Sequence, residues 1–415
     1  MLALLESDEP GSLLARALGS LGWELVAWQR TAVHHRPGAG VTGVFSIDLV
    51  PRRERRRDRT GDRAPDDTVG TAPTHACITS CTVQGPAGRV VVFHRRGADT
   101  LSVWVHPFDP LLPGLAMALD RQRVTSFAFG SGRPAGDTVL ELTGYRPLRR
   151  AVVLARNDGD RRYLKVLRRG AGAAMAERHR MLRASGIPAP LLTGDPVDDV
   201  VAMHPAEGRP MAELLMRDGA SGVDPHALVR LLRLLPDAVL RLPERPPWAA
   251  RVLDYGEGAA AALPGMTDRI RRLAADIGDT VRGSADGPRV PTHGDFYEGN
   301  LLIADGTVSG LLDVDALGPG RIVDDLACFL GHIAVLPGLH PGYSHVPWAL
   351  RRFAEAFDQY VDPVALRSRA AAVSLTLIAG ARGRTGNAGG SAEALSRLEV
   401  AERFLAEARA IQAWR

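Results

Sequence analysis

At 415 residues the chain is long enough for two or three domains, each with a sizeable core. Hydrophobic residues make up 45% and charged residues 24%, as in ordinary globular proteins, and no apolar run approaches the roughly 20 residues of a membrane span. The net charge of +4 comes mainly from scattered arginines without interleaved aromatic residues. We therefore expect neither a membrane protein nor a nucleic-acid-binding protein.

The first residues do not have the pattern of an export signal, because the apolar start at 1–5 lacks a basic region and runs into acidic residues. Cysteine is rare, with Cys77, Cys81 and Cys328, so we expect a protein of the reducing cytoplasm. Cys77 and Cys81 share strand parity with His75, but their spacing is not that of a zinc site. We interpret them as buried or half-buried strand residues.

The first 130 residues predict a small α+β module of unknown role. A short helix is expected at 10–20, and an Arg-rich stretch at 51–73 is expected to be an exposed, mobile loop. A second short helix is expected at 116–123. The predicted strands lie at 23–31, 43–50, 75–83, 89–94 and 101–106.

From residue 137 the pattern changes to three strands, a helix and two further strands, which predicts a five-stranded sheet with one helix. The third strand carries Lys165, the only lysine among 51 basic residues. Because arginine is otherwise used almost everywhere, Lys165 is a candidate for a role that arginine cannot fill. The expected elements are strands at 138–143, 151–155, 163–167, 191–192 and 200–203, and a helix at 173–184.

The predicted helix supplies a partner for this lysine. Glu177 lies at helical spacing from Ala174 and Met181, on the face expected to pack against the sheet. A carboxylate on an apolar face is costly unless it is paired, so a Lys165–Glu177 ion pair is expected. The first two strands are joined by residues 145–150 without a glycine-rich loop. If this sheet binds a phosphorylated ligand, either Arg149 or Arg150 could contact its phosphates at this turn, although arginines at a turn are more often simply exposed.

The rest of the chain predicts a connector and then a mostly helical region. The connector at 203–208 begins with Met203, and it would join the sheet to the helices. Helices are expected at 226–242, 266–281, 322–336, 347–360, 363–380 and 392–414.

Within the helical region, the stretch THGDFYEGNLL at 292–302 precedes a predicted hairpin. Two short apolar runs are joined by Asp305-Gly306, which is a strong hairpin signal. A hairpin folds its ends together, so Asp295 and Asn300 at one end can converge with Asp313 at the other. Three hard oxygen ligands in one place suit Mg²⁺, as phosphoryl transfer requires.

This motif and the order of elements resemble the aminoglycoside phosphotransferase and choline kinase family. The resemblance implies an α+β, two-lobed protein kinase-like fold with an N-lobe at 137–205 and a helical C-lobe at 206–415, preceded by the module at 1–130. By motif, Asp295 would be the catalytic base, and Asn300 and Asp313 the metal ligands. Lys165, paired with Glu177, would bind the ATP phosphates, and the backbone at the Met203 hinge would hold adenine.

The resemblance also suggests roles for residues around the motif. His293 would be structural and would bond the backbone near the metal-binding aspartate, and Asp315 would assist with magnesium or substrate. Asp325 would tie the following helix to the catalytic loop. Arg321 departs from the family pattern, which often has an aspartate at that place, so its role is open.

We therefore expect a phosphotransferase that uses ATP or GTP with Mg²⁺ to phosphorylate a hydroxyl of a small molecule, such as an antibiotic, a sugar or a related natural product. Residues 331–415 contain ten arginines and seven acidic residues, which tilts the expectation slightly towards a neutral or anionic acceptor. The identity of the acceptor, the nucleotide preference and the oligomeric state are left open.

Two other classes remain as alternatives. A protein kinase is disfavoured by the His-Gly-Asp loop, the missing glycines and the lack of an Ala-Pro-Glu signature. A non-catalytic, nucleotide-binding pseudokinase with a partner-binding N-terminal module is disfavoured because all five of Lys165, Glu177, Asp295, Asn300 and Asp313 are retained.

Overall fold

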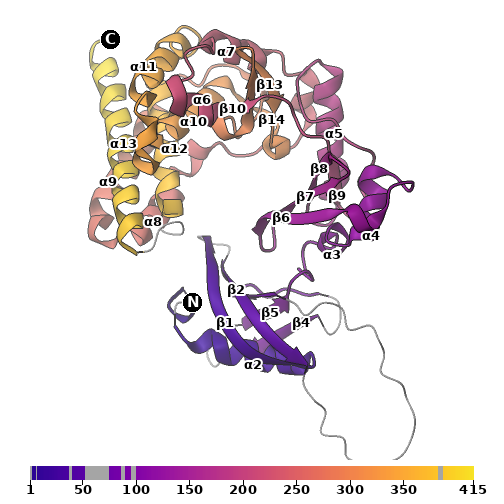
Figure 1. The fold of residues 1–415 in the computed structure, drawn as a ribbon. Helices are drawn as coiled ribbons and strands as arrows, with labels where there is room; N and C mark the ends of the chain where they lie inside the picture. The colour runs from indigo at the N-terminus through magenta and orange to yellow at the C-terminus, as the bar shows by residue number, and fades with distance from the viewer. Residues whose placement is uncertain are drawn as a thin grey trace, which may run out of the picture. The chain divides into compact units, whose positions relative to one another are not determined.

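The computed structural model describes residues 2–5, 7–36, 40–51, 74–85, 89–94, 100–381 and 387–415 (Figure 1). The chain divides into two compact units. Unit 1 contains Met1–Ala173 and Thr193–Ala202, and unit 2 contains Ala174–Leu192 and Met203–Arg415. The Arg-rich loop predicted at 51–73 lies, beyond its first residue, outside the described residues.

Unit 1 begins with a five-stranded antiparallel sheet in the order β1-β2-β3-β5-β4, which confirms the strands predicted for this region. Alternating residues give the sheet two apolar faces. On one face, Phe45, Ile78 and Leu101 pack with Leu14 and Leu18 of helix α2. The other face carries a second cluster of buried residues. The elements are α1 (Leu2–Leu5), α2 (Glu9–Ser20), β1 (Trp23–Arg36), β2 (Gly40–Pro51), β3 (His75–Thr79), β4 (Val90–His94) and β5 (Thr100–Val105).

A second sheet follows, with four strands in the order β6-β7-β8-β9. The fifth strand predicted at 191–192 contributes only a single bridge between Leu192 and Met203, so that prediction was wrong in extent. Pro188 and Pro190, which lack backbone N–H donors, precede it and limit strand pairing. The strands are β6 (Val139–Arg146), β7 (Arg150–Asn157), β8 (Asp160–Val166) and β9 (Val200–Met203).

Short helices pack against this four-stranded sheet. Leu115, Val124 and Ala128 are fully buried with Val153 and Leu164 of the sheet in one apolar cluster. In the sequence these helices lie between the first and the second sheet. Their buried side chains form one hydrophobic core with the second sheet. They are α3 (Leu115–Ala118), α4 (Arg121–Val124) and the π-helix η1 (Thr125–Phe129).

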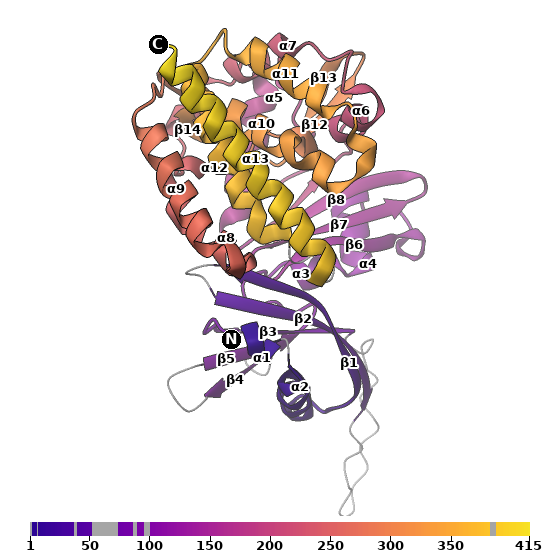
Figure 2. The ribbon, with the colours of Figure 1, turned by 90° about the vertical axis from the view of Figure 1, so that its left-hand side faces the viewer.

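Unit 2 is mostly helical, as predicted, and α8, α9, α12 and α13 lie side by side within it (Figure 2). The helix expected at 226–242 ends at Arg233, and a 3₁₀ turn follows Pro236, which removes a helical hydrogen-bond donor. Helices α6 and α8 were not predicted. The helices are α5 (Ala171–Ala184), which begins in unit 1, α6 (Met211–Asp218), α7 (Pro225–Arg233), α8 (Val252–Ala262), α9 (Thr267–Arg282), α10 (Ile322–Leu339), α11 (Val346–Phe357), α12 (Pro363–Ala381) and α13 (Asn387–Ala413).

Among the described residues, α10 and α12 are the two helices long and apolar enough to cross a membrane by length and composition. Their most apolar windows are 67% and 78% buried inside the structure. This burial is that of core helices, whose apolar surface is covered by the rest of the protein.

Candidate active site

The predicted hairpin is present and begins the site. Strand β12 (Leu301–Ala304) pairs with β13 (Thr307–Leu311) in antiparallel fashion. Asp305 and Gly306 between them both have positive φ, 49° and 74°, as a two-residue hairpin turn requires. At the other end of the hairpin, the Leu312 amide donates to the Asn300 carbonyl at 2.8 Å. The hairpin thus holds the backbone before Asp313 against the end of the loop at 292–300.

Asn300 is oriented by the loop that it ends. It is buried, and its amide nitrogen donates to the carbonyl oxygen of Asp295 at 2.9 Å. Its own backbone amide donates to the Tyr297 carbonyl. Because the amide nitrogen is used by Asp295, the side-chain oxygen is the atom suited to ligate a cation.

His293 connects the loop to the residue before Asp313. The side chain is fully buried, with Nε2 at 2.9 Å from the Leu312 carbonyl oxygen and Nδ1 at 3.3 Å from the Asp295 amide nitrogen. An imidazole that donates from Nε2 and accepts at Nδ1 is neutral. His293 therefore makes the backbone contacts that its motif position predicts.

Asp325 in the first turn of α10 holds the start of the loop. Its two carboxylate oxygens accept hydrogen bonds from the backbone amides of His293 (2.7 Å) and Gly294 (2.8 Å). Burial raises the pKa of Asp325 to about 7, and the two amides oppose this rise. The predicted tie between α10 and the catalytic loop is confirmed.

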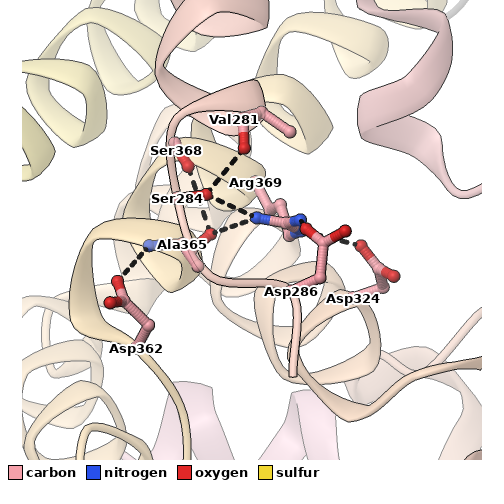
Figure 3. Close-up of polar contacts among 8 residues, drawn as sticks. All are labelled: Val281, Ser284, Asp286, Asp324, Asp362, Ala365, Ser368 and Arg369. Carbon is pink, nitrogen blue, oxygen red and sulfur yellow. Dashed lines mark hydrogen bonds and ion pairs between the residues drawn. The ribbon is translucent and has the colours of Figure 1, made fainter. Parts of the chain in front are cut away.

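The N-terminal end of α10 is in turn fixed to α12 by Arg369 (Figure 3). Arg369 is buried, and its Nε donates to Asp324 at 3.1 Å. Its terminal nitrogens contact Ser284 Oγ at 3.1 Å, the Ala365 carbonyl at 3.4 Å and the Asp286 carboxylate. Burial raises the pKa of Asp324, and the guanidinium opposes this rise. Because Asp325 directly follows Asp324 in the chain, these contacts also hold the backbone that carries Asp325.

Two backbone conformations at the site are unusual. Gly294 has a φ of 79°, and a Cβ there would lie 2.5 Å from the Ala316 carbonyl oxygen, so glycine is required. Asp313 has a φ of 57° and a ψ of 49°, a left-handed conformation that costs a non-glycine residue about 1 kcal/mol or more. Such strain persists where surrounding contacts impose it, and it often marks functional sites.

The negative charges of Asp295 and Asp313 both affect the pKa of Tyr297. The pKa of the Tyr297 hydroxyl is raised by burial and then by the negative charges of Asp295 and Asp313. Tyr297 stacks on His332 of α10, with ring centroids 4.2 Å apart. Burial also raises the pKa of Glu298 to about 7, and its Oε2 has no hydrogen-bond partner within the described part of the chain. Neither His332 nor Glu298 was predicted, because no spacing in the sequence indicates this tertiary contact or this burial.

Asp315 lies in a 3₁₀ turn (Val314–Ala316), not on a strand. Neither Asp313 nor Asp315 is part of β13, because this strand ends at Leu311. The charge of Asp315 acts on the guanidinium of Arg178, whose pKa is lowered by burial and by Arg245 and raised by Asp315. Asp315 therefore lies beside a basic group of α5.

Of the predicted nucleotide-binding residues, Lys165 is on the third strand of the second sheet as expected. It lies on β8 opposite Val152 and is 6% exposed. Met203 is the last residue of β9, and a connector without regular secondary structure follows it up to β10 (Arg209–Pro210). These positions agree with the predicted strand and connector.

Glu177 does not lie on the buried face of α5, so that prediction was wrong. Its side chain is exposed, whereas the buried side chains include Met175, His179 and Leu182 at i, i+4 and i+7. The predicted apolar stripe was one residue out of phase, which turns a side chain by about 100° around a helix.

The donor set suits magnesium better than a transition metal. The described residues contain no group of three or more His, Cys, Asp or Glu side chains placed to hold a metal ion. An amide oxygen from Asn300 and a carboxylate from Asp313 are few protein ligands, and Mg²⁺ characteristically combines one or two carboxylates with phosphate oxygens and water. The residues present therefore fit an ion that arrives with a nucleotide.

This chain is similar to solved structures of kinases and phosphotransferases. Among solved structures, the chain is similar to a choline/ethanolamine kinase family protein from Mesorhizobium loti, with 16% identity, 70% of this chain and 97% of that chain covered, and a TM-score of 0.47. It is also similar to an ethanolamine kinase from Plasmodium vivax (9% identity, 69% and 89% covered, TM-score 0.46). A third is a spectinomycin phosphotransferase solved with ADP and spectinomycin (14% identity, 66% and 93% covered, TM-score 0.45).

No curated protein matches the chain. The model of the phosphotransferase enzyme family matches residues 147–368, which is more than half of the chain and includes the catalytic loop and the hairpin. The chain therefore belongs to the phosphotransferase enzyme family, with a protein kinase-like α+β fold, and is a kinase that transfers phosphate to a hydroxyl group of a small molecule.

Proposed function

We propose that this protein uses ATP and Mg²⁺ to phosphorylate a hydroxyl of an antibiotic, a sugar or a related natural product. The observation that supports this most is the loop that orients Asn300 on Asp295 and, through His293 and the hairpin, ties both to the backbone beside Asp313. Phosphoryl transfer depends mainly on such positioning, since there is little covalent chemistry for the protein to perform.

In this proposal Asp295 is the catalytic base. Its carboxylate accepts a hydrogen bond from the acceptor hydroxyl and takes the proton as the oxygen attacks the γ-phosphorus. The bond between the γ-phosphorus and the β–γ bridging oxygen breaks, and ADP leaves with that oxygen. The hydrogen bonds of His293 and Asn300 to the Asp295 backbone hold the base at a fixed place.

Asn300 and Asp313 are the residues that would hold magnesium. When bound, the ion would neutralise negative charge on the phosphate oxygens. Lys165 would neutralise the α- and β-phosphates with a compact ammonium group that arginine does not reproduce. The backbone of the connector after Met203 would hold the adenine.

The test is ATP consumption by the purified protein with Mg²⁺ on a panel of aminoglycosides, peptide antibiotics, nucleosides, sugars and choline-like alcohols. Turnover on one class would identify the acceptor. In the Asp295→Ala protein, we expect turnover on that acceptor to fall by about two to four orders of magnitude, while Mg-nucleotide binding persists.

Asp305→Asn is the matched control, because Asp305 is exposed at the far turn of the same hairpin and asparagine also adopts a positive φ. Its turnover should equal that of the parent protein. Unchanged turnover in Asp295→Ala would contradict the base assignment. Tight nucleotide binding without turnover on any acceptor would favour a non-catalytic nucleotide-binding protein.

A further inference from the structure

The turn between β6 and β7 has a backbone that its sequence does not favour. The Arg149 amide donates to the Arg146 carbonyl at 3.0 Å, which closes a four-residue turn. Pro147 occupies its second position, and Leu148, at the third, has a φ of 64°. This is the pattern of a type II turn, in which the third position is normally glycine. A leucine there needs support from outside the turn.

The support comes from three sides of Leu148. Its amide donates to Oδ2 of Asp109 at 2.8 Å, and its carbonyl accepts from Nε of Arg168 at 2.6 Å. Its side chain is 7% exposed and belongs to the cluster on the second face of the five-stranded sheet. The other buried members of this cluster are Val44, Cys77, Val83 and Trp104.

Asp109 is the centre of this anchor. It is 4% exposed, and in addition to Leu148 it accepts from the Tyr145 hydroxyl at 2.8 Å and from the Leu111 amide at 2.9 Å. The Tyr145 hydroxyl in turn accepts from Nε1 of Trp104 at 3.3 Å. Burial raises the pKa of Asp109, and its hydrogen-bond donors oppose that rise. Buried polar groups with this many partners fix one conformation.

Hairpin turns normally lie on the surface and move easily. In protein kinases the turn between the first two strands is a glycine-rich loop that covers the nucleotide phosphates. Here the corresponding turn has Pro147 and Leu148 in place of glycines, and both are buried. Contacts with residues that precede it in the chain, and not glycine residues, therefore allow the turn to adopt this backbone conformation.

We propose that the N-terminal five-stranded sheet and the segment that follows β5 position the nucleotide. Asp109 of that segment, through Tyr145 and the Leu148 amide, and the sheet, through its contacts with the Leu148 side chain, hold the β6–β7 turn in the conformation that binds MgATP. This inference rests on the proposed function. Asp109 touches no reacting atom in it and acts only through the turn.

The test compares three variants of the full chain. Asp109→Asn leaves one acceptor oxygen where the carboxylate serves three donors on two oxygens, and Leu148→Ala removes the buried anchor without touching Asp109. Thr42→Val is the control. It deletes the buried Thr42–Thr79 hydrogen bond (2.8 Å) of the same sheet, which does not reach the turn. The probe is Mg-AMP-PNP, measured by calorimetry below each variant's melting temperature.

We expect Asp109→Asn and Leu148→Ala to raise the Kd for Mg-AMP-PNP at least tenfold, and Thr42→Val to change it less than twofold even where its melting temperature falls equally. With an acceptor from the panel, the KM for ATP should rise in the first two variants while the KM for the acceptor stays constant. Equal nucleotide Kd values in all variants would overturn this inference alone. A parent protein that does not bind the probe would overturn the proposed function and this inference with it.

Discussion

At the scale of single residues, His332, which stacks on Tyr297, makes the stability of the folded protein depend on pH. Burial and, to a smaller extent, the positive charge of Arg397 lower the pKa of His332 to about 4. The unfolded chain takes up this proton near pH 6.5, whereas the folded protein resists it until about pH 4. Protonation of His332 therefore does not reduce the free energy of unfolding above pH 6.5. As the pH falls from 6.5 towards 4, the unfolded chain binds the proton and the folded protein does not, so the free energy of unfolding decreases.

We predict that His332→Phe, which keeps a ring against Tyr297, removes this acid sensitivity. The parent should lose about 2 kcal/mol of unfolding free energy between pH 7 and pH 4.5 from this residue, and the variant should lose correspondingly less. Urea unfolding at the two pH values measures the difference. His345→Gln, at an exposed position of unit 2, should keep the parent's pH dependence. Equal acid sensitivity in His332→Phe and the parent would contradict the prediction.

Residues that belong to the recognised motif could be predicted from the sequence. His293 and Asp325 were assigned backbone contacts from their places around the motif, and both make them. Glu177 was misplaced because its assignment depended on helix phase, which a single residue of error changes. Asp109 and His332 could not be found, because no motif or spacing in the sequence joins them to their partners Tyr145 and Tyr297.

At the scale of elements, the β12–β13 hairpin was predictable because Asp305-Gly306 specifies the turn by its own backbone preference. Helices α6 and α8 were missed for local reasons. Helix α6 has only 8 residues, and α8 contains two glycines in its sequence VLDYGEGAAAA, which weaken helix propensity. Tertiary packing stabilises these two helices, and this packing cannot be read from the local sequence pattern.

The attachment of α10 to α12 gives a prediction about stability. Arg369→Met leaves the Asp324 carboxylate, 17% exposed, without its guanidinium partner. Removing one partner of a buried ion pair costs about 3–5 kcal/mol, which urea unfolding would measure. Arg271→Met is the control, since Arg271 pairs with Glu257 where both side chains are exposed, and its loss should be below about 1 kcal/mol. Equal losses in the two variants would contradict the prediction, and Asp324→Leu added to Arg369→Met should recover stability.

At the scale of the whole molecule, residues before 137 supply part of the core of the second sheet. A chain that begins at residue 137 lacks Leu115, Val124 and Ala128, which pack against β6–β9, and also lacks Asp109. Burial of each large apolar side chain contributes about 1.5–3 kcal/mol.

We predict that the chain 137–415 is aggregated or unfolds at a much lower temperature, and that the chain 107–415 retains more stability because it keeps helices α3 and α4. Thermal unfolding and size-exclusion chromatography would rank the three proteins. A fully stable 137–415 chain would show that the second sheet needs no part of the N-terminal segment.

The lone lysine on β8 has a practical consequence for chemistry on this protein. Reagents that acylate or reductively methylate amines can react only at Lys165 and at the chain's α-amino group. Since Lys165 is 6% exposed, its labelling reports access to one buried strand position. The isotope-labelled methyl signal of Lys165, distinguished from that of the α-amino group, would then follow ligand occupancy at that ammonium, in a protein of 44.4 kDa, without any engineered tag.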